Sequence, residues 1–179
     1  MIFDTLDGQP AIQAARFTLR PLRASDAGLL QLHAGDVRVA TATSSIPHPL
    51  PPGAAEAFIA RSHAPDRTED TWVMDGSAFG LAELLGVIGL ERMDRNQSEV
   101  GYWVAPAFWN TGIASEAVEA LVAANPHGAR TLFASVFQDN PASAQVLTHA
   151  GFAYIGDAEV YAVSRAATVA TWTYLRKLD

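Results

Sequence analysis

Hydrophobic and polar residues alternate along several segments of this chain, and a period of two predicts β-strands. Residues 17–20 alternate in this way, and the strand that they predict ends at Pro21. The same alternation returns, between short runs of turn-forming residues, in residues 72–74, 84–93 and 99–104. We expect these last three strands to pair as an antiparallel meander.

Other segments of the first half carry apolar residues at helical spacing. Ser25 and Asp26 favour the start of a helix that includes a run of leucines, and residues 37–43 favour a helical continuation. Four prolines between positions 47 and 52 exclude a helix there, so we expect an extended stretch that borders a cleft. Residues 53–62 again predict a helix.

The second half predicts helices and strands in alternation. After Gly112, an apolar stripe with helical spacing runs to residue 124 and ends at a turn-forming segment. The pattern then predicts a strand at 131–137, a helix at 140–150, and strands at 152–161 and 168–177. The fold class is therefore α/β (α+β), with a mixed, mostly antiparallel sheet flanked by helices. Residues 1–15 are expected to form a lead-in segment, and residues 16–179 a single domain.

Composition narrows the class of protein. The chain has 179 residues, of which 49% are hydrophobic and 17% charged, as is typical of an ordered globular domain. It has no cysteine, which excludes disulfides and a thiolate nucleophile, and its histidines lack metal-ligand spacing, so no metal is expected. A net charge of −7 disfavours nucleic acid as a partner. The longest apolar run is too short for a membrane span, and we expect a cytoplasmic protein without a signal peptide.

A glycine turn before a predicted helix indicates an anion site. Residues 104–117 predict a strand that stops at Pro106 and turns through Gly112 into a helix. The first N–H groups of a helix have no partner within it and carry a partial positive charge. Small residues there (Gly112, Ala114 and Ser115) admit a phosphate, and the amides of residues 111–115 can converge on a pyrophosphate. The chain lacks a Walker loop and a dinucleotide glycine fingerprint.

A second segment joins this loop to a known family. Asn140 suits a helix N-cap and Pro141 the first helical position, and Gly151 and Phe152 follow that helix. The two segments together resemble the cofactor site of the GNAT superfamily of N-acetyltransferases. That site reads Val-x-Pro-x-x-(Gln/Arg)-x-x-Gly-x-(Gly/Ala), and the matching residues are Val104, Pro106, Gly112 and Ala114, with Trp109 at the Gln/Arg position. The segments 19–22, 100–103 and 140–143 are most similar to the ribosomal-protein N-terminal acetyltransferases.

The resemblance covers residues 17–177 and implies acetyl-CoA as co-substrate without a metal. It implies that a bulge near Pro106 splays two parallel strands, and that the pantetheine arm lies in the gap, bonded to main-chain groups near Trp103 and Val104. The pyrophosphate is expected at the amides of Thr111, Gly112, Ile113, Ala114 and Ser115. Asn140 and Ser143 are expected to meet the cofactor arm.

The proton-transfer groups are less well marked. Many members of this superfamily carry a tyrosine as the acid five residues before the Gly-Phe phenylalanine, where this chain has Leu147, so Ser143 or an ordered water is expected to replace it. We choose Glu99 as the base, because it begins the strand that leads into the loop. A surface carboxylate at a hairpin is an equal alternative, and Glu91 and His48 are reserves.

These expectations define a function. Deprotonating an α-amine of pKa about 7.8 at pH 7 requires roughly 1 kcal/mol, whereas a lysine of pKa about 10.4 requires roughly 4.6 kcal/mol. We therefore expect transfer of an acetyl group to a peptide α-amine or a small-molecule amine by direct attack. The alternative is a non-catalytic acyl-CoA-binding module, and a small hydrolase is disfavoured because no Ser/His/Asp spacing supports it.

Trp103 and Trp109 are either core aromatics, which we favour for Trp109, or walls of the site. A homodimer is left open.

Overall fold

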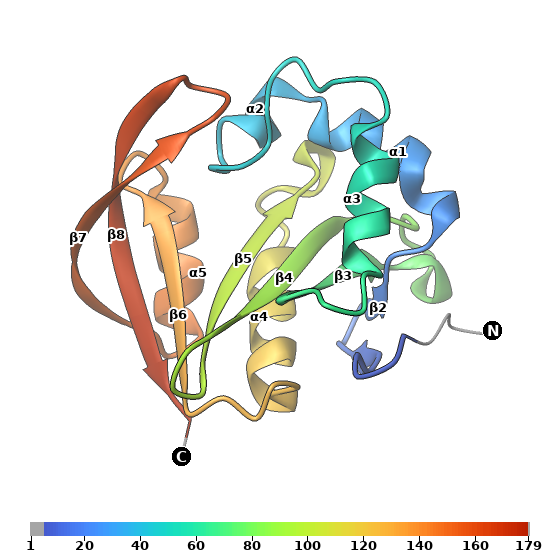
Figure 1. The fold of residues 1–179 in the computed structure, drawn as a ribbon. Helices are drawn as coiled ribbons and strands as arrows, with labels where there is room; N and C mark the ends of the chain where they lie inside the picture. The colour runs from blue at the N-terminus through green and yellow to red at the C-terminus, as the bar shows by residue number, and fades with distance from the viewer. Residues whose placement is uncertain (1–5, 179) are drawn as a thin grey trace.

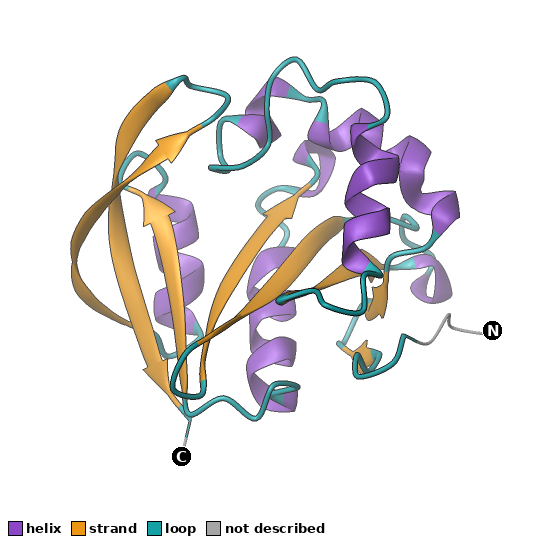
Figure 2. Cartoon of the chain, viewed as in Figure 1, coloured by secondary structure: helices purple, strands orange, loops and turns teal. Residues whose placement is uncertain are grey.

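The computed structural model describes residues 6–178. The strands form one eight-stranded sheet in the order β1-β2-β3-β4-β5-β6-β8-β7 (Figures 1 and 2). Their bounds are Ile12–Gln13 (β1), Thr18–Pro21 (β2), Glu69–Asp75 (β3), Gly86–Met93 (β4), Gln97–Val104 (β5), Thr131–Phe137 (β6), Ala153–Ala162 (β7) and Ala167–Lys177 (β8). All neighbours are antiparallel except β5 and β6. The expected mixed α/β sheet and its antiparallel meander are confirmed.

Within residues 6–178, five α-helices flank this sheet on its two faces. Their bounds are Ala27–Ala34 (α1), Val37–Ala40 (α2), Ala54–Ser62 (α3), Ile113–Ala124 (α4) and Pro141–His149 (α5). The expected helix at 37–43 is shorter than predicted, because the chain turns after Ala40. None of the described helices has the length and apolar character needed to cross a membrane.

Alternation along the strands produces two cores. Trp72 belongs to the cluster that packs against α4 and α5, whereas its neighbour Val73 belongs to the cluster that packs against α1 and α3. The strand pattern therefore fixes which helices lie on which face, as Figure 1 shows. Residues 12 and 13, within the expected lead-in, pair with β2 at the sheet edge.

The sheet opens between β5 and β6. Only residues 97–99 of β5 pair with residues 131–133 of β6, and beyond Glu99 the two strands diverge (Figure 2). The expected splay is thus confirmed, but the bulge that the resemblance implied is absent from the described β4–β5 ladder, whose register is continuous from Met93 and Gln97 to Gly86 and Val104. Pro106 marks the end of β5 instead, since a short 3-10 turn, Pro106–Phe108, follows directly.

Candidate functional site

The loop between β5 and α4 leaves a set of backbone donors without protein acceptors. Gly112 is the N-cap of α4 at φ 81°, a conformation that suits glycine, and it offers no side-chain cap. Asn110 is also left-handed, with φ 61°. Among the hydrogen bonds of residues 6–178, none is donated by the N–H groups of residues 110–115. The sequence-predicted loop residues, Thr111, Gly112, Ile113, Ala114 and Ser115, are therefore consecutive at a helix N-terminus with unused donors.

Two side chains fix this loop from outside. Arg16 donates from its guanidinium to the carbonyl oxygen of Thr111 at 2.9 Å and to Oε1 of Glu116 at 2.8 Å. The backbone N–H of Arg16 also donates to Glu116, at 2.9 Å. Glu116 lies in the first turn of α4, so Arg16 connects the segment before β2 to both the loop and the helix. Sequence patterns gave no signal for this contact between residues 100 positions apart.

Trp109 is not the core aromatic that we favoured. Its side chain is 42% exposed, and its indole N–H donates to the carbonyl oxygen of Val104 at 2.7 Å. The indole therefore holds the loop to the end of β5 and takes up one main-chain acceptor that the resemblance assigned to the cofactor arm. Trp103, in contrast, packs against the α1–α3 core and lines the cavity described next.

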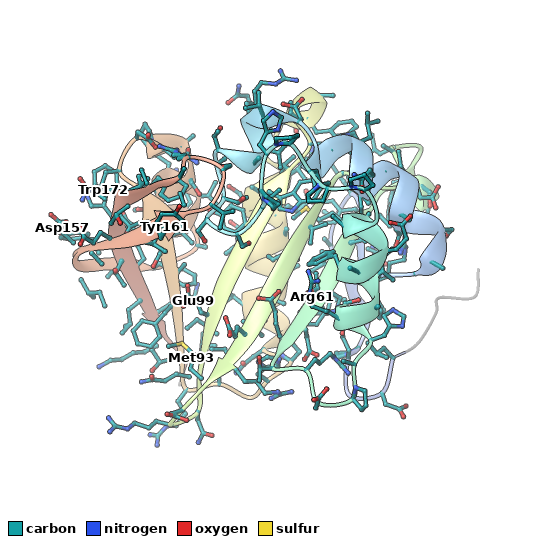
Figure 3. The ribbon with its side chains drawn as sticks, turned by 45° about the horizontal axis from the view of Figure 1, so that its top comes forward. Arg61, Met93, Glu99, Asp157, Tyr161 and Trp172 are labelled. Atoms are coloured by element: carbon teal, nitrogen blue, oxygen red, sulfur yellow. The ribbon has the colours of Figure 1, made fainter. Side chains whose placement is uncertain are left out.

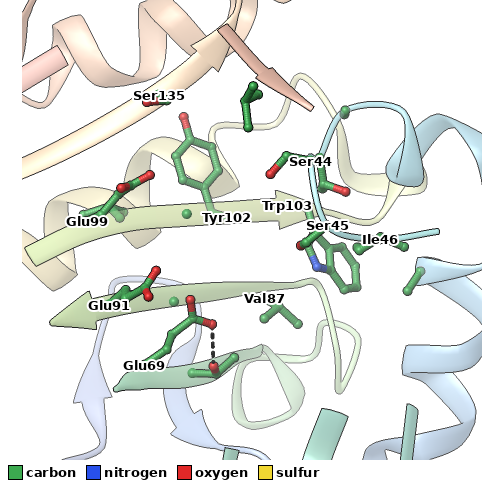
Figure 4. A pocket seen from close by; sticks show the side chains of 18 of the residues that line it. Ser44, Ser45, Ile46, Glu69, Val87, Glu91, Glu99, Tyr102, Trp103 and Ser135 are labelled. Carbon is green, nitrogen blue, oxygen red and sulfur yellow. Dashed lines mark hydrogen bonds between the residues drawn. The ribbon is translucent and has the colours of Figure 1, made fainter. Parts of the chain in front are cut away.

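A cavity of 690 Å³ begins at the gap between β5 and β6 and extends over the face of the sheet that carries α3 (Figure 4). Tyr102 and Trp103 of β5, Val136 of β6, and Asn140 and Ser143 of α5 line its part at the gap. Its other walls come from α3, from residues 44–47, from Leu50 within the proline-rich stretch at 47–52, and from residues 158–160 of β7. The proline-rich stretch thus borders the cavity, but His48 is exposed and does not line it.

Three carboxylates form a row across the floor of this cavity. Glu69, Glu91 and Glu99 are direct cross-strand neighbours on β3, β4 and β5, and all three line the cavity (Figure 4). Figure 3 shows Glu99 and Arg61 of α3 over the same face of the sheet. Gly89 leaves room for this row, because a Cβ atom there would lie 3.1 Å from the carboxyl carbon of Glu69.

Partial burial and repulsion between the charges of this row disfavour the ionisation of Glu69 and Glu99. Partial burial raises the pKa of Glu99, and repulsion from Glu91 raises it further. Partial burial likewise raises the pKa of Glu69, with a hydrogen bond from Thr71 acting against it and the charges of Glu91 and Glu99 adding to it. Within residues 6–178, none of the three carboxylates forms a salt bridge. A carboxylate of raised pKa that faces a cavity is a stronger base than an ordinary exposed carboxylate.

On the opposite side of the gap, a pair of hydroxyl groups spans β5 and α5. The hydroxyl oxygen of Tyr102 lies 2.8 Å from Oγ of Ser143. Asn140 caps α5, since its Oδ1 accepts the N–H of Ser143 at 3.3 Å. Leu147 is fully buried in the core. The sequence identified Ser143 and Asn140, but it named Tyr102 only within a motif. The available signal was the period of two along β5, which places Tyr102 on the face opposite Glu99.

The structure also joins Ser98, His127 and Asp70, although their spacing in the sequence suggested no such group. Oγ of Ser98 lies 2.9 Å from Nδ1 of His127, and Nε2 of His127 lies 2.8 Å from Oδ2 of Asp70. Ser98 is only 1% exposed, so a substrate cannot reach its hydroxyl. This chain of hydrogen bonds ties β3 and β5 to the segment after α4, and it is structural rather than a hydrolase triad.

The arrangement fits a long acyl carrier with a diphosphate. Unused donors lie at a helix N-terminus that has no side-chain cap. The adjoining strands diverge and leave the main-chain edge of β5 unpaired by β6 beyond Glu99, although the carbonyl oxygen of Val104 accepts the indole N–H of Trp109. The gap leads to a cavity with carboxylates on its far floor.

Comparison with known proteins identifies the class. The family model described as the acetyltransferase (GNAT) domain matches residues 16–153, which is most of the chain. The protein therefore belongs to the GNAT acetyltransferase domain family, and the resemblance stated from its motifs is confirmed.

Similar proteins agree with this assignment. The uncharacterized N-acetyltransferase YoaA of Bacillus subtilis (strain 168) is 35% identical over 74 residues, which cover 39% of this chain and 42% of that protein. The microcin C7 self immunity acetyltransferase MccE, solved with acetyl-CoA and AMP, has a TM-score of 0.78 at 15% identity, covering 91% of this chain and 93% of its own. The ribosomal L7/L12 alpha-N-protein acetyltransferase RimL, solved with coenzyme A, has a TM-score of 0.77 at 17% identity, covering 95% and 99%. At these identities the two structures establish the fold.

Proposed function

We propose that this protein transfers an acetyl group from acetyl-CoA to a primary amine. The observation that carries the proposal is the run of unused N–H donors at residues 110–115, placed beside a gap in the sheet that leads into the carboxylate-lined cavity. Membership of the GNAT family supports it, as does the similarity to MccE and RimL, which were solved with acetyl-CoA and coenzyme A.

The loop and the strand edges would hold the donor substrate. The amides of residues 111–115 and the dipole of α4 favour the pyrophosphate, since both place positive charge at one point. The free edge of β5 near Trp103 would bond the pantetheine arm and polarise the thioester carbonyl. Holding both substrates in the gap supplies much of the rate enhancement, because it converts a bimolecular reaction into an oriented one.

Glu99 would collect the proton of the amine. Its raised pKa brings the carboxylate closer to the pKa of an α-ammonium group, so proton transfer between them is less unfavourable. Glu91 and Glu69 extend the negative charge across the cavity floor and attract the ammonium form before it is deprotonated. The neutral amine then attacks the thioester directly.

The acceptor is proposed to be a peptide or protein N-terminal α-amine or a small-molecule amine. An α-amine loses its proton at a cost of roughly 1 kcal/mol at pH 7, well below the cost for a lysine side chain. RimL is an alpha-N-protein acetyltransferase, and the similarity to it supports the first of these acceptors. The cavity of 690 Å³ has room for a small amine or for the first residues of a peptide.

The experiment mixes purified protein with acetyl-CoA and a panel of peptide and small amines, and measures free thiol and acetylated product. We expect thiol release in proportion to the acceptor, and loss of most activity in Glu99→Gln. Isothermal calorimetry measures the binding of coenzyme A in parallel. Both an enzyme and a non-catalytic acyl-CoA-binding module would bind coenzyme A, but the binding module would release no thiol with any amine. Absence of both binding and thiol would refute the two readings together.

A further inference from the structure

Tyr102 and Glu99 reach the gap from opposite faces of one strand. Residues three apart on a β-strand point to opposite sides, so Glu99 faces the cavity floor while Tyr102 faces α5. The ring of Tyr102 packs against the α4–α5 core, and its hydroxyl group lies 2.8 Å from Oγ of Ser143. A thioester held between β5 and β6 would therefore have a carboxylate on one side and a hydroxyl pair on the other.

The direction of the hydrogen bond follows from the two hydroxyl groups. A phenol is more acidic than an aliphatic alcohol and is the stronger donor, so Tyr102 donates to Oγ of Ser143. The carbonyl oxygen of Ser143 lies farther away, at 3.3 Å, and is the weaker acceptor for the same proton. Burial raises the pKa of Tyr102 to about 12, which keeps its hydroxyl protonated at any working pH. With its oxygen occupied as an acceptor, Ser143 has its own hydroxyl hydrogen free to donate.

Neighbouring residues offer no substitute for this pair. Leu147, at the position where the resemblance expects a tyrosine, is buried and apolar. The side-chain oxygen of Asn140 is used as the cap of α5. Ser135 of β6 also lines the cavity, but it alternates with the core residues Ala134 and Val136 and so lies on the face of the sheet opposite α5. The hydroxyl donors on the α5 side are therefore those of Tyr102 and Ser143.

We propose that Tyr102 is a positioning residue: it donates to Ser143 Oγ and thereby directs the Ser143 hydroxyl hydrogen at the sulfur of the departing thiolate. The inference rests on the proposed function. Where the sequence suggested that Ser143 replaces a missing tyrosine as an acid, the structure assigns a two-residue unit in which the tyrosine comes from β5 instead of α5.

The step balances without proton transfer from either hydroxyl. The amine nitrogen forms its bond to the carbonyl carbon, the C–S bond breaks, and its electron pair stays on sulfur. Glu99 has by then passed the proton of the ammonium form to solvent. It takes the second proton that the nitrogen loses as its bond to carbon forms, and passes that to solvent as well. A thiol has an ordinary pKa of about 8.5, so the thiolate is a weaker base than the conjugate bases of both hydroxyls, and a hydrogen bond from Ser143 is enough to stabilise it. The thiolate takes its proton from water on release.

Four variants test the unit: Tyr102→Phe, Ser143→Ala, their double variant, and Ser143→Thr, which keeps a hydroxyl group. We measure kcat, KM for acetyl-CoA and the Kd of coenzyme A for each. Tyr102→Phe is expected to lower kcat about tenfold with KM and Kd unchanged, as loss of one hydrogen bond that acts in the transition state would. Ser143→Ala is expected to lower kcat at least as much, and the double variant no further, since the two residues act as one unit. Ser143→Thr should retain most of the activity.

The matched control is Tyr154→Phe, which removes a tyrosine hydroxyl that bonds Asp157 at 2.6 Å on β7, outside the cavity lining. It should keep the kcat of the wild type. The inference is overturned if Tyr102→Phe keeps the wild-type kcat, or if its effect is the same with and without Ser143→Ala. If Tyr102→Phe does not fold, Ser143→Ala decides alone: an unchanged kcat overturns the inference. All three of these outcomes leave the proposed function standing, whereas a wild type that releases no thiol with any amine overturns that function and the inference with it.

Discussion

Glu91 and Glu99 are cross-strand neighbours, and their two negative charges repel each other. Glu99 must be ionised to act as a base, so kcat/KM should rise with pH through its raised pKa. Removing the neighbouring charge lowers that pKa, and we expect Glu91→Gln to move the acidic limb of the profile to lower pH. The measurement is kcat/KM between pH 4.5 and 8 at constant salt.

Glu119→Gln provides the control for this profile, because Glu119 is exposed on α4, away from the cavity. It removes the same charge and should leave the acidic limb in place. An unmoved limb in Glu91→Gln, with activity retained, would show that the titrating group is not Glu99 beside Glu91.

A buried ion cluster makes the strongest prediction about stability. The guanidinium of Arg20 is fully buried and donates to both carboxylate oxygens of Asp26, at 2.8 and 2.9 Å, and to Asp75 at 2.7 Å. Asp26→Ala leaves a buried cation with one partner fewer and also removes the acceptor of the Arg23 N–H. We expect a loss of about 3–5 kcal/mol in the free energy of unfolding, measured by urea denaturation.

The comparison variant is Arg38→Ala, which breaks the ion pair with Asp36 at a side chain that is 62% exposed and leaves Asp36 in place as the cap of α2. Exposed pairs contribute about 0–1 kcal/mol, so its urea midpoint should stay close to that of the wild type. Equal effects of the two substitutions would contradict the assigned role of the buried cluster.

At the scale of elements, the loop before α4 depends on a contact from the start of the chain. Arg16 bonds the carbonyl oxygen of Thr111 and the carboxylate of Glu116, and so holds the donors of residues 111–115 in one arrangement. Arg16→Ala frees this loop, and coenzyme A must then order it on binding. We expect the Kd of coenzyme A to rise about five- to tenfold with little change in the free energy of unfolding.

Calorimetry measures this Kd, with Arg130→Ala as the control, since Arg130 is exposed and lies beyond the other end of α4. A rise in Kd for both variants would indicate a general effect of lost positive charge. An unchanged Kd in Arg16→Ala would show that the loop keeps its form without the arginine.

The sequence predicted local features well because they follow from local rules. Helix α4 begins after Gly112, and β6 spans the residues that the alternation indicated. Long-range side-chain contacts carried no such signal. The bond of Trp109 to Val104 and the chain from Ser98 through His127 to Asp70 depend on side-chain directions after folding. Tyr102 was overlooked for the same reason, because its partner Ser143 lies 41 residues away.

For the whole molecule, the cavity is closed where two distant turns meet. The guanidinium of Arg165, in the turn between β7 and β8, donates to the carbonyl oxygen of Thr41 at 2.7 and 3.0 Å and to Asp139 at 2.6 Å. The N–H of Val163 donates to the carbonyl oxygen of Ser44 at 3.0 Å, and Ser44 itself lines the cavity. The hairpin of β7 and β8 thus supports the wall formed by residues 44–47 (Figure 1).

Arg165→Ala should loosen this wall without reaching the loop before α4. We expect a several-fold higher KM for the amine and a smaller rise in the Kd of coenzyme A, because the lost bonds to Thr41 belong to this wall whereas the lost bond to Asp139 lies beside Asn140. Steady-state kinetics and calorimetry separate the two constants. Lys177→Ala, which removes an exposed charge from the end of β8, is the control. An equal fold-change in the KM of the amine and the Kd of coenzyme A would show that this wall does not act mainly on the acceptor.

The junction of these turns also bears on how the acceptor choice of such a protein can be altered. The carboxylates stand on strands held by continuous main-chain ladders, whereas the wall above them is built from two surface turns that bond mainly to each other. New turn sequences can therefore reshape the entrance while the carboxylates keep their positions. A library that seeks new acceptors should vary residues 41–47 and 162–167 as a pair, since a change in one turn removes the bonding partner of the other.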